Sequence, residues 1–130
     1  ASMFDRIETL RMAGSLTAHA TERQKLIAQN VANADTPGFR ARDLAGFAET
    51  YRSRVSIEMR GTRPGHLTGN SWGGAERIED TGGEPAPNGN TVSLEDEMIR
   101  VAATRREFDM SLAVTRSAMS LIRTSLGRRS

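Results

Sequence analysis

The stretch NVANADTPGFRARD, residues 30–43, interrupts a long helical pattern and turns the chain sharply. Pro37 disfavours the helical conformation at the residue before it, and Pro-Gly suits the central positions of a type II turn. Asn30 and Asn33 are three residues apart and therefore share a helix face, where their amides can bond helix carbonyls or a neighbouring backbone. The stretch predicts the end of a helix and a defined exit for the chain.

Polar side chains precede the turn, and an aromatic residue follows it. Asp35 and Thr36 favour local side-chain bonds that compete with helix, and Phe39 is an apolar anchor beside two arginines. The residues alone leave two interpretations open: an ordinary helix stop, or a turn that directs the chain between neighbouring subunits. The candidate subunit-contact residues are Asn30, Asn33, Asp35, Thr36, Pro37, Gly38, Phe39, Arg40, Arg42 and Asp43.

The segment before the turn, residues 1–33, has the pattern of one long helix. Its large apolar residues recur at roughly helical spacing, small residues fill the gaps, and no proline intervenes. His19 is followed by Arg23 four residues later, which we interpret as a solvent-exposed pattern rather than a ligand pair. The apolar positions are Phe4, Ile7, Leu10, Leu16, Leu26, Ile27 and Val31.

The last segment, residues 93–130, predicts a second long helix. Ser93 precedes an acidic first turn and fits an N-cap, and Gly127 with its neighbouring arginines fits a helix end. Between them the pattern steps by four and three residues, as in a coiled coil. We call its apolar positions the seam and expect it to mediate assembly: Leu94, Met98, Val101, Phe108, Leu112, Met119, Ile122 and Leu126.

The middle segment, residues 34–92, is different in composition. Eight of the twelve glycines and three of the four prolines lie between residues 61 and 89. Such a segment cannot build a core alone, so we expect extended or irregular chain, with at most a short strand near residues 55–59 and a turn at Asn88-Gly89.

The predicted fold is therefore mainly α, with long N- and C-terminal helices packing as an antiparallel coiled-coil core around an extended, Gly/Pro-rich middle segment. Two helices bury only one stripe on each other, so the remaining apolar positions need another partner, which we expect to be another copy or a related chain.

Composition limits the function classes. A chain of 130 residues forms one domain at most, and without cysteine it has no disulfide or thiolate chemistry. No apolar run approaches the roughly 20 residues of a membrane span, and no cleavable secretory signal opens the sequence. Charge is segregated: residues 76–97 carry seven acids and one arginine, whereas residues 100–130 carry seven arginines and two acids. Such segregation suits complementary contacts between copies or between segments.

The sequence holds no recognisable catalytic, cofactor or metal-binding pattern. His19 and His66 are the only histidines, and neither belongs to a zinc motif. The glycine-rich stretch at residues 69–76 lacks the Lys-Ser/Thr of a phosphate-binding loop. We therefore expect no enzyme, no cofactor and no metal. A basic helical nucleic-acid-binding protein is the alternative from another class, but acids dilute the seventeen arginines and no stacking aromatics accompany them.

Three motifs carry a resemblance to a known family. The stretch at residues 30–43 resembles the signature of the axial proteins of the bacterial flagellum, which comprise rod, hook and related subunits. GTRPGHL at residues 61–67 and GNTVSLEDEM at residues 89–98 are similar to further patterns of that family. Phe39 and Phe108 stand where the family usually has tyrosine, and residues 72–87 match no family pattern.

This resemblance implies a structural subunit that polymerises through its terminal helices. It implies a place in the proximal rod of the basal body, in the periplasmic space, where the subunit helps to link the membrane ring to the distal rod and to transmit torque. Export through the type III export gate, without cleavage, is implied as well. The implied partners are other copies, the rod proteins FlgC, FlgF and FlgG, the adaptor FliE, the membrane ring and the export gate. Another proximal rod subunit, FlgC-like, is the alternative within the family, and the Thr-Pro-Gly turn argues against it.

Overall fold

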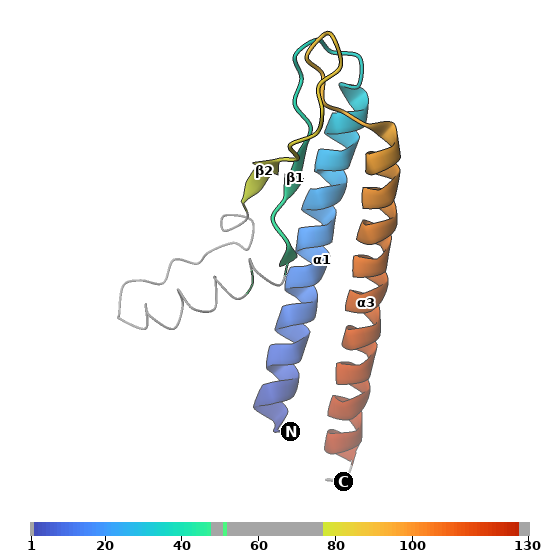
Figure 1. The fold of residues 1–130 in the computed structure, drawn as a ribbon. Helices are drawn as coiled ribbons and strands as arrows, with labels where there is room; N and C mark the ends of the chain where they lie inside the picture. Colours follow the sequence, from blue (N-terminus) through green and yellow to red (C-terminus); the bar gives the residue numbers. More distant parts are fainter. Residues whose placement is uncertain (1, 48–50, 52–76, 128–130) are drawn as a thin grey trace, which may run out of the picture.

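Two long antiparallel helices form the molecule, and a short sheet lies beside the first of them (Figure 1). This computed structural model describes residues 2–47, 51 and 77–127. The helices are α1 (Met3–Ala32) and α3 (Leu94–Gly127), and the strands are β1 (Arg42–Leu44) and β2 (Ile78–Asp80). The predicted mainly α architecture is confirmed. The strand predicted near residues 55–59 lies outside the described residues.

Helix α1 begins with a capping box. The hydroxyl of Ser2 accepts a hydrogen bond from the backbone N–H of Asp5 at 3.2 Å, and the Asp5 carboxylate accepts one from the Ser2 N–H at 3.2 Å. These two bonds satisfy N–H groups that a helix start leaves unpaired. The helix then continues through Gly14 and ends at Ala32. The prediction of one long helix before the turn is therefore confirmed.

Helix α3 begins as the sequence predicts. The Ser93 hydroxyl accepts from the N–H of Asp96 at 3.3 Å, and three acidic residues, 95–97, follow in the first turn. Negative charge is favourable there because the helix dipole places partial positive charge at the N-terminus. The helix is described as far as Gly127, and the arginines of the predicted helix end lie outside the described residues.

The two helices pack with a seven-residue repeat on each side of their contact, as in a coiled coil. Three of the four buried positions of α3 are small, and the Thr17 hydroxyl of α1 donates to the Ser111 hydroxyl at 2.9 Å. On α3 the buried positions are seven residues apart: Glu97, Thr104, Ser111 and Ala118. On α1 the repeat of alternating three and four residues runs through Ala13, Leu16, Ala20, Arg23, Ile27 and Asn30.

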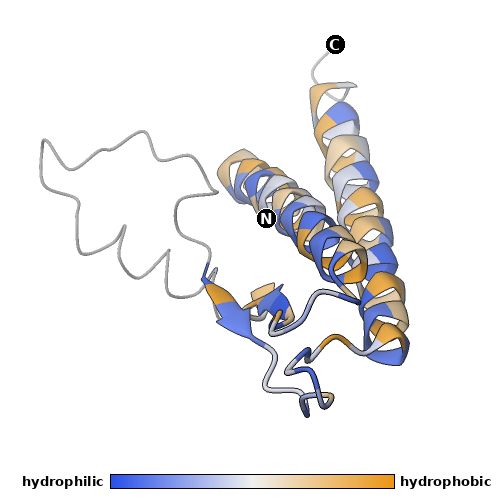
Figure 2. Ribbon diagram, turned by 90° about the horizontal axis from the view of Figure 1, so that it is seen from above, coloured by the Kyte–Doolittle hydropathy of each residue, from blue (hydrophilic) through white to orange (hydrophobic). Residues whose placement is uncertain are grey.

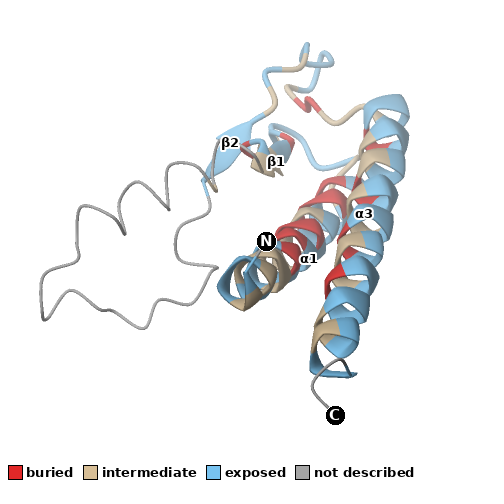
Figure 3. Ribbon diagram, turned by 90° about the horizontal axis from the view of Figure 1, so that it is seen from below, coloured by how far each residue is buried: buried red, intermediate tan, exposed pale blue. Residues whose placement is uncertain are grey.

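The seam lies on a neighbouring face of α3 and not in this contact. Phe108 and Ile122 are half-buried, and the other six seam residues are exposed, from Met119 at 41% to Met98 at 71%. Figure 3 shows buried residues along the facing sides of the helices and exposed residues over the outer surface of α3. The 3.5-residue apolar repeat therefore belongs to a surface that the described residues leave largely uncovered.

The hydrophobic core of the described residues is small. Five of its nine members are alanine, whereas fourteen large hydrophobic residues are exposed. Figure 2 shows hydrophobic residues distributed around both helices instead of being confined to their contact. Alanine contributes little apolar area, so the packing of the described residues leaves many of their large apolar side chains exposed. The core residues are Ala13, Leu16, Ala20, Leu26, Ile27, Ala41, Leu44, Ala45 and Ala118.

The sheet fixes the chain after the turn against α1. Strands β1 and β2 are antiparallel, with Asp43 opposite Glu79. The ladder extends by one backbone bond on each side, from the N–H of Ala45 to the carbonyl of Arg77 at 2.9 Å and from the N–H of Thr81 to the carbonyl of Ala41 at 3.0 Å. Neither α1 nor α3 is long and apolar enough to cross a membrane.

Candidate assembly surfaces

The corner after α1 contains a type II turn. The backbone N–H of Phe39 donates to the carbonyl of Thr36 at 3.2 Å, which closes a four-residue turn with Pro37 and Gly38 at its centre. Gly38 has φ +75°, the conformation that the third position of a type II turn requires. The turn predicted from Pro-Gly is confirmed.

A second turn packs directly on the first. The N–H of Gly89 donates to the carbonyl of Ala86 at 2.8 Å, so a turn is present with Pro87 and Asn88 at its centre, one residue before the predicted Asn88-Gly89 pair. The N–H of Gly38 donates to the carbonyl of Asn88 at 2.9 Å. A Cβ at Gly89 would lie 3.3 Å from the Cα of Gly38, tighter than ordinary contact. The two turns therefore meet backbone to backbone, which glycine permits.

Asn90 fastens the end of α1 to this second turn. Its side-chain amide donates to the carbonyls of Asn33 at 2.9 Å and of Thr36 at 2.7 Å, and the residue is only 4% exposed. The neighbouring Thr91 hydroxyl accepts from the N–H of Ala41 at 2.8 Å. Helix ends leave carbonyls without intrahelical partners, and here the chain just before α3 supplies those partners.

Asn30 joins the first helix, the first strand and the last helix. Its fully buried side chain donates to the carbonyl of Arg42 at 2.8 Å and accepts from the N–H of Arg42 at 3.0 Å. The same amide nitrogen donates to the Glu97 carboxylate at 3.1 Å. The Asn30 side chain thus bonds both backbone groups of one residue of β1, as a neighbouring strand would. The prediction that its amide bonds a neighbouring backbone is confirmed. Asn33 bonds a helix carbonyl instead, that of Gln29 at 2.8 Å.

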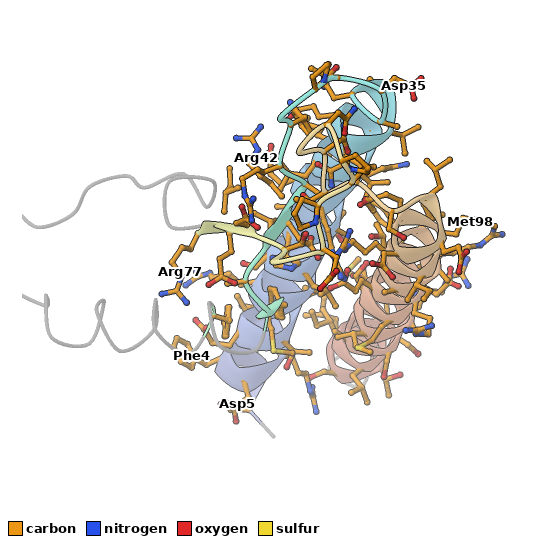
Figure 4. All side chains as sticks on the ribbon, turned by 45° about the horizontal axis from the view of Figure 1, so that its top comes forward. Phe4, Asp5, Asp35, Arg42, Arg77 and Met98 are labelled. Carbon is orange, nitrogen blue, oxygen red and sulfur yellow. The ribbon has the colours of Figure 1, made fainter. Side chains whose placement is uncertain are left out.

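The other predicted contact residues divide into exposed and inward-facing groups. The tip residues Asp35, Thr36 and Pro37 are exposed, and Figure 4 shows Asp35 at the far end of the hairpin. Phe39 is half-buried. The exposed Arg40 pairs with Asp80 and lowers the pKa of that carboxyl. Exposed Arg42 donates to the Gln29 side chain at 3.0 Å, and half-buried Asp43 faces inward.

Asp43 belongs to an ionic network between the helices. Arg23 of α1 donates two bonds to its carboxylate, at 3.0 and 3.1 Å, and a third to Glu107 of α3 at 3.2 Å. Arg100 of α3 lies 3.4 Å from the Asp43 carboxylate and pairs also with Glu97. Bidentate arginine–carboxylate pairs have a fixed geometry, so this network ties α1, β1 and α3 into one register.

The interpretation of His19 as a solvent-exposed residue is wrong. Its side chain is 2% exposed, 3.7 Å from Glu107, and its ring meets the Phe47 ring edge-on with centroids 5.4 Å apart. The spacing of charged residues on α3 could have signalled the network that surrounds it. Arg100 and Glu107 are seven residues apart, and each lies three residues after a buried position of the contact, Glu97 and Thr104.

His19 makes stability depend on pH. Burial lowers the pKa of His19 below its ordinary value of 6.5, and Glu107 only partly opposes this. As pH falls through 6.5 the unfolded chain takes up the proton first, so the free energy of unfolding decreases toward the lower folded-state pKa. We expect His19→Gln to lose less stability between pH 8 and pH 5 than the unmodified chain, as measured by urea unfolding. Equal losses in both chains would contradict this assignment.

Asn30 should matter more to stability than Asn33. Asn30→Ala leaves the part-buried N–H and carbonyl of Arg42 without their side-chain partner, and a fully buried group left unsatisfied would cost about 1–3 kcal/mol. Asn33→Ala is the matched control because its side chain bonds only exposed partners, the Gln29 carbonyl and the Thr36 hydroxyl. Urea unfolding should show a large decrease for the first variant and a small one for the second. Similar decreases in the free energy of unfolding of the two variants would show that the bonds from Asn30 to β1 do not contribute to stability.

The exposed seam is the second candidate assembly surface. It runs along one side of α3 from Leu94 to Leu126. Burying one leucine or methionine side chain contributes about 1.5–3 kcal/mol, so a partner that covered the seam would gain substantially. Contiguous exposed apolar surface of this kind marks interaction sites in soluble proteins. Among the residues that the structure describes, no three potential metal ligands cluster together.

Comparison with known proteins gives consistent matches. Residues 10–40 match the family model described as flagella basal body rod protein. A protein from Escherichia coli strain K12 named flagellar basal body rod protein FlgB is 32% identical over 124 residues, covering 85% of this chain and 88% of that protein. The proteins of the same name from Agrobacterium fabrum and Salmonella typhimurium are each 28% identical, over 119 and 130 residues. The alignment with the Agrobacterium fabrum protein covers 85% of this chain and 87% of that protein. The alignment with the Salmonella typhimurium protein covers 90% of this chain and 92% of that protein.

Proposed function

This chain belongs to the family of the flagellar basal body rod protein FlgB, and from that premise we propose that it is a subunit of the proximal rod that assembles through its terminal helices. The family makes it a structural component of the rod, located in the flagellar basal body. The proposal concerns its position in the rod, the surface through which it assembles and its mechanical role.

The exposed seam is the observation that carries this proposal. A chain whose α3 uses small and polar residues for its contact with α1, and exposes a coiled-coil repeat of large apolar residues, is suited to pack against other helices. In a rod of such subunits, each α3 would offer its seam to the helices of its neighbours. The apolar area then buried would stabilise the polymer and not the single chain.

The turn corner supplies stiffness to the same subunit. Asn30, Asn90 and the two packed turns hold the end of α1 against the start of α3. The network of Arg23 and Asp43 then fixes the two helices in one register. A subunit that transmits torque between the membrane ring and the distal rod needs a fixed relation between its helices, and this corner would provide it.

Most of the described arginines near the corner are paired within the chain. Arg23, Arg40 and Arg100 each contact carboxylates, and this pairing favours a structural role over phosphate binding. We propose that the chain passes uncleaved through the type III export gate to the periplasmic space. There it would contact further copies, FlgC, FlgF, FlgG, FliE, the membrane ring and the gate.

Complementation of a flagellated strain that lacks its own FlgB tests this function. Cells that produce the tagged chain should swim, and basal bodies purified from them should contain the tag in the rod fraction. A strain that carries the empty vector is the control. Basal bodies that form without the tagged chain, or a chain that is found only in the cytoplasm of motile cells, would contradict the proposal.

A further inference from the structure

Each buried position of α3 is followed directly by a residue of a second, exposed row. The buried positions that face α1 are Glu97, Thr104, Ser111 and Ala118. The residues that follow them are Met98, Arg105, Leu112 and Met119, of which all but Arg105 belong to the seam. One residue corresponds to about 100° around a helix, so a rotation of α3 by that amount would exchange one row for the other.

Apolar burial alone would favour the rotated arrangement. Met98, Leu112 and Met119 are exposed by 71%, 49% and 41%. The side chains that they would replace against α1 end in a carboxylate, a hydroxyl and a methyl group. The hydrophobic effect grows with the apolar area removed from water, so the seam would contribute more to a contact with α1 than the observed row does. Something other than apolar packing therefore holds α3 in the observed rotation.

Near the start of α3, two charged residues are tied to α1 and to β1. Glu97 is 2% exposed, and its carboxylate accepts a hydrogen bond from the Asn30 amide of α1 at 3.1 Å. Arg100 pairs with Glu97 and lies 3.4 Å from the carboxylate of Asp43 on β1. A buried polar group can specify one arrangement at a cost in stability, as a single asparagine does in coiled coils.

Farther along α3, Glu107 makes the corresponding contacts. Its carboxylate accepts from Arg23 of α1 at 3.2 Å and lies 3.7 Å from the buried ring of His19. Glu107 precedes Leu112 by five residues, which corresponds to about 140° around the helix. A rotation that turned Leu112 toward α1 would therefore carry Glu107 to the outer side of α3 and break both contacts.

We propose that Glu97, Arg100 and Glu107 form a rotational lock, which holds α3 in the rotation that turns the seam outward. Without the lock, α3 turns by about 100° and buries Leu112 and Met119 against α1 of its own chain. Such a chain keeps its two helices but has no seam to offer. This inference rests on the proposed function, since an outward seam matters only to a chain that assembles through it. It adds a device that keeps the single chain competent for assembly.

Cysteine pairs report the rotation, because the natural chain has no cysteine. The hydroxyls of Thr17 and Ser111 are 2.9 Å apart, so Thr17→Cys with Ser111→Cys marks the observed rotation. Thr17→Cys with Leu112→Cys marks the rotated one. In purified monomer under mild oxidation the first pair should close about tenfold faster than the second, because a disulfide requires Cβ atoms about 4 Å apart. Mass spectrometry of the unreduced monomer measures both products.

Removal of the lock should reverse this order. The lock-deficient chain carries alanine at all three lock positions: Glu97→Ala, Arg100→Ala and Glu107→Ala. A matched control chain loses two acids and one arginine from exposed positions of the same helix: Glu95→Ala, Arg106→Ala and Asp109→Ala. We expect the Leu112 pair to close faster than the Ser111 pair in the lock-deficient chain only. Circular dichroism should show equal helix content in both chains.

A folded lock-deficient chain that still closes only the Ser111 pair would overturn the inference. The proposed function would then stand, since complementation with the unmodified chain tests it separately. If alanine at the lock positions unfolds the helices, Glu97→Gln with Glu107→Gln replaces the alanine variant, because both changes keep the shape of the side chain. Loss of the helices in that chain too would show that the network is needed for helix pairing itself, which contradicts a lock on rotation alone.

Discussion

Leu112→Asp and Met119→Asp are each expected to abolish rod formation and swimming while the chain is still produced with its helices intact. Both residues belong to the seam, and both are exposed in the single chain, at 49% and 41%. An aspartate at either position meets water in the free subunit and costs it little. In a packed interface the same carboxylate is buried without a partner, which costs several kcal/mol for each subunit contact.

Ser120→Asp is the matched control for these variants. It introduces the same charge next to Met119, at an exposed position off the seam. Basal bodies counted by electron microscopy should be absent in the two seam variants and close to normal in the control. Circular dichroism of the purified chains should be alike in all three. Normal numbers of basal bodies in Leu112→Asp and Met119→Asp cells would show that the seam does not mediate assembly.

Gly38→Val is expected to have the second largest effect. The residue has φ +75°, and no atom lies within 4 Å of a Cβ placed there, so the penalty comes from the backbone and not from a clash. A left-handed conformation costs about 1–3 kcal/mol for a residue with a side chain, and β-branched residues tolerate it worst. If the turn opens, the bond from Gly38 to the Asn88 carbonyl is lost and the two turns separate. Rods should then be few or shear easily.

Two further glycine variants separate the conformational penalty at residue 38 from a general effect of replacing glycine. Gly38→Asn should be milder than Gly38→Val because asparagine adopts positive φ more readily. Gly14→Ala, in the interior of α1 with open space around it, should stabilise the chain by about 0.5–1 kcal/mol. Rod counts and urea unfolding together test this order. Intact basal bodies in normal numbers with Gly38→Val would reduce the turn to a simple helix stop.

Local signals in the sequence predict the elements of this fold. The Pro37-Gly38 turn and the Ser93 cap depend on neighbouring residues, and the structure contains both. The turn predicted at Asn88-Gly89 forms as well, shifted by one residue so that Pro87 and Asn88 are at its centre. Each of these features is specified by conformational preferences that act over a few residues, so the sequence is sufficient to locate them.

The pairing between elements could not be predicted in the same way. His19 and Glu97 have the appearance of surface residues in sequence, yet both are 2% exposed because partners from α1, β1 and α3 surround them. The seam shows the converse. An apolar heptad predicts burial, but only the tertiary structure shows that the α1 contact uses another face and leaves the seam for a different partner.

The most direct measurement is a density map of an assembled basal body that contains this chain, at a resolution that shows side chains. The account predicts that the seam from Leu94 to Leu126 lies against helices of neighbouring subunits, while Thr104 and Ser111 keep facing α1 of the same chain. A map in which Leu112 and Met119 face solvent, with neighbouring subunits held by other surfaces, would contradict it.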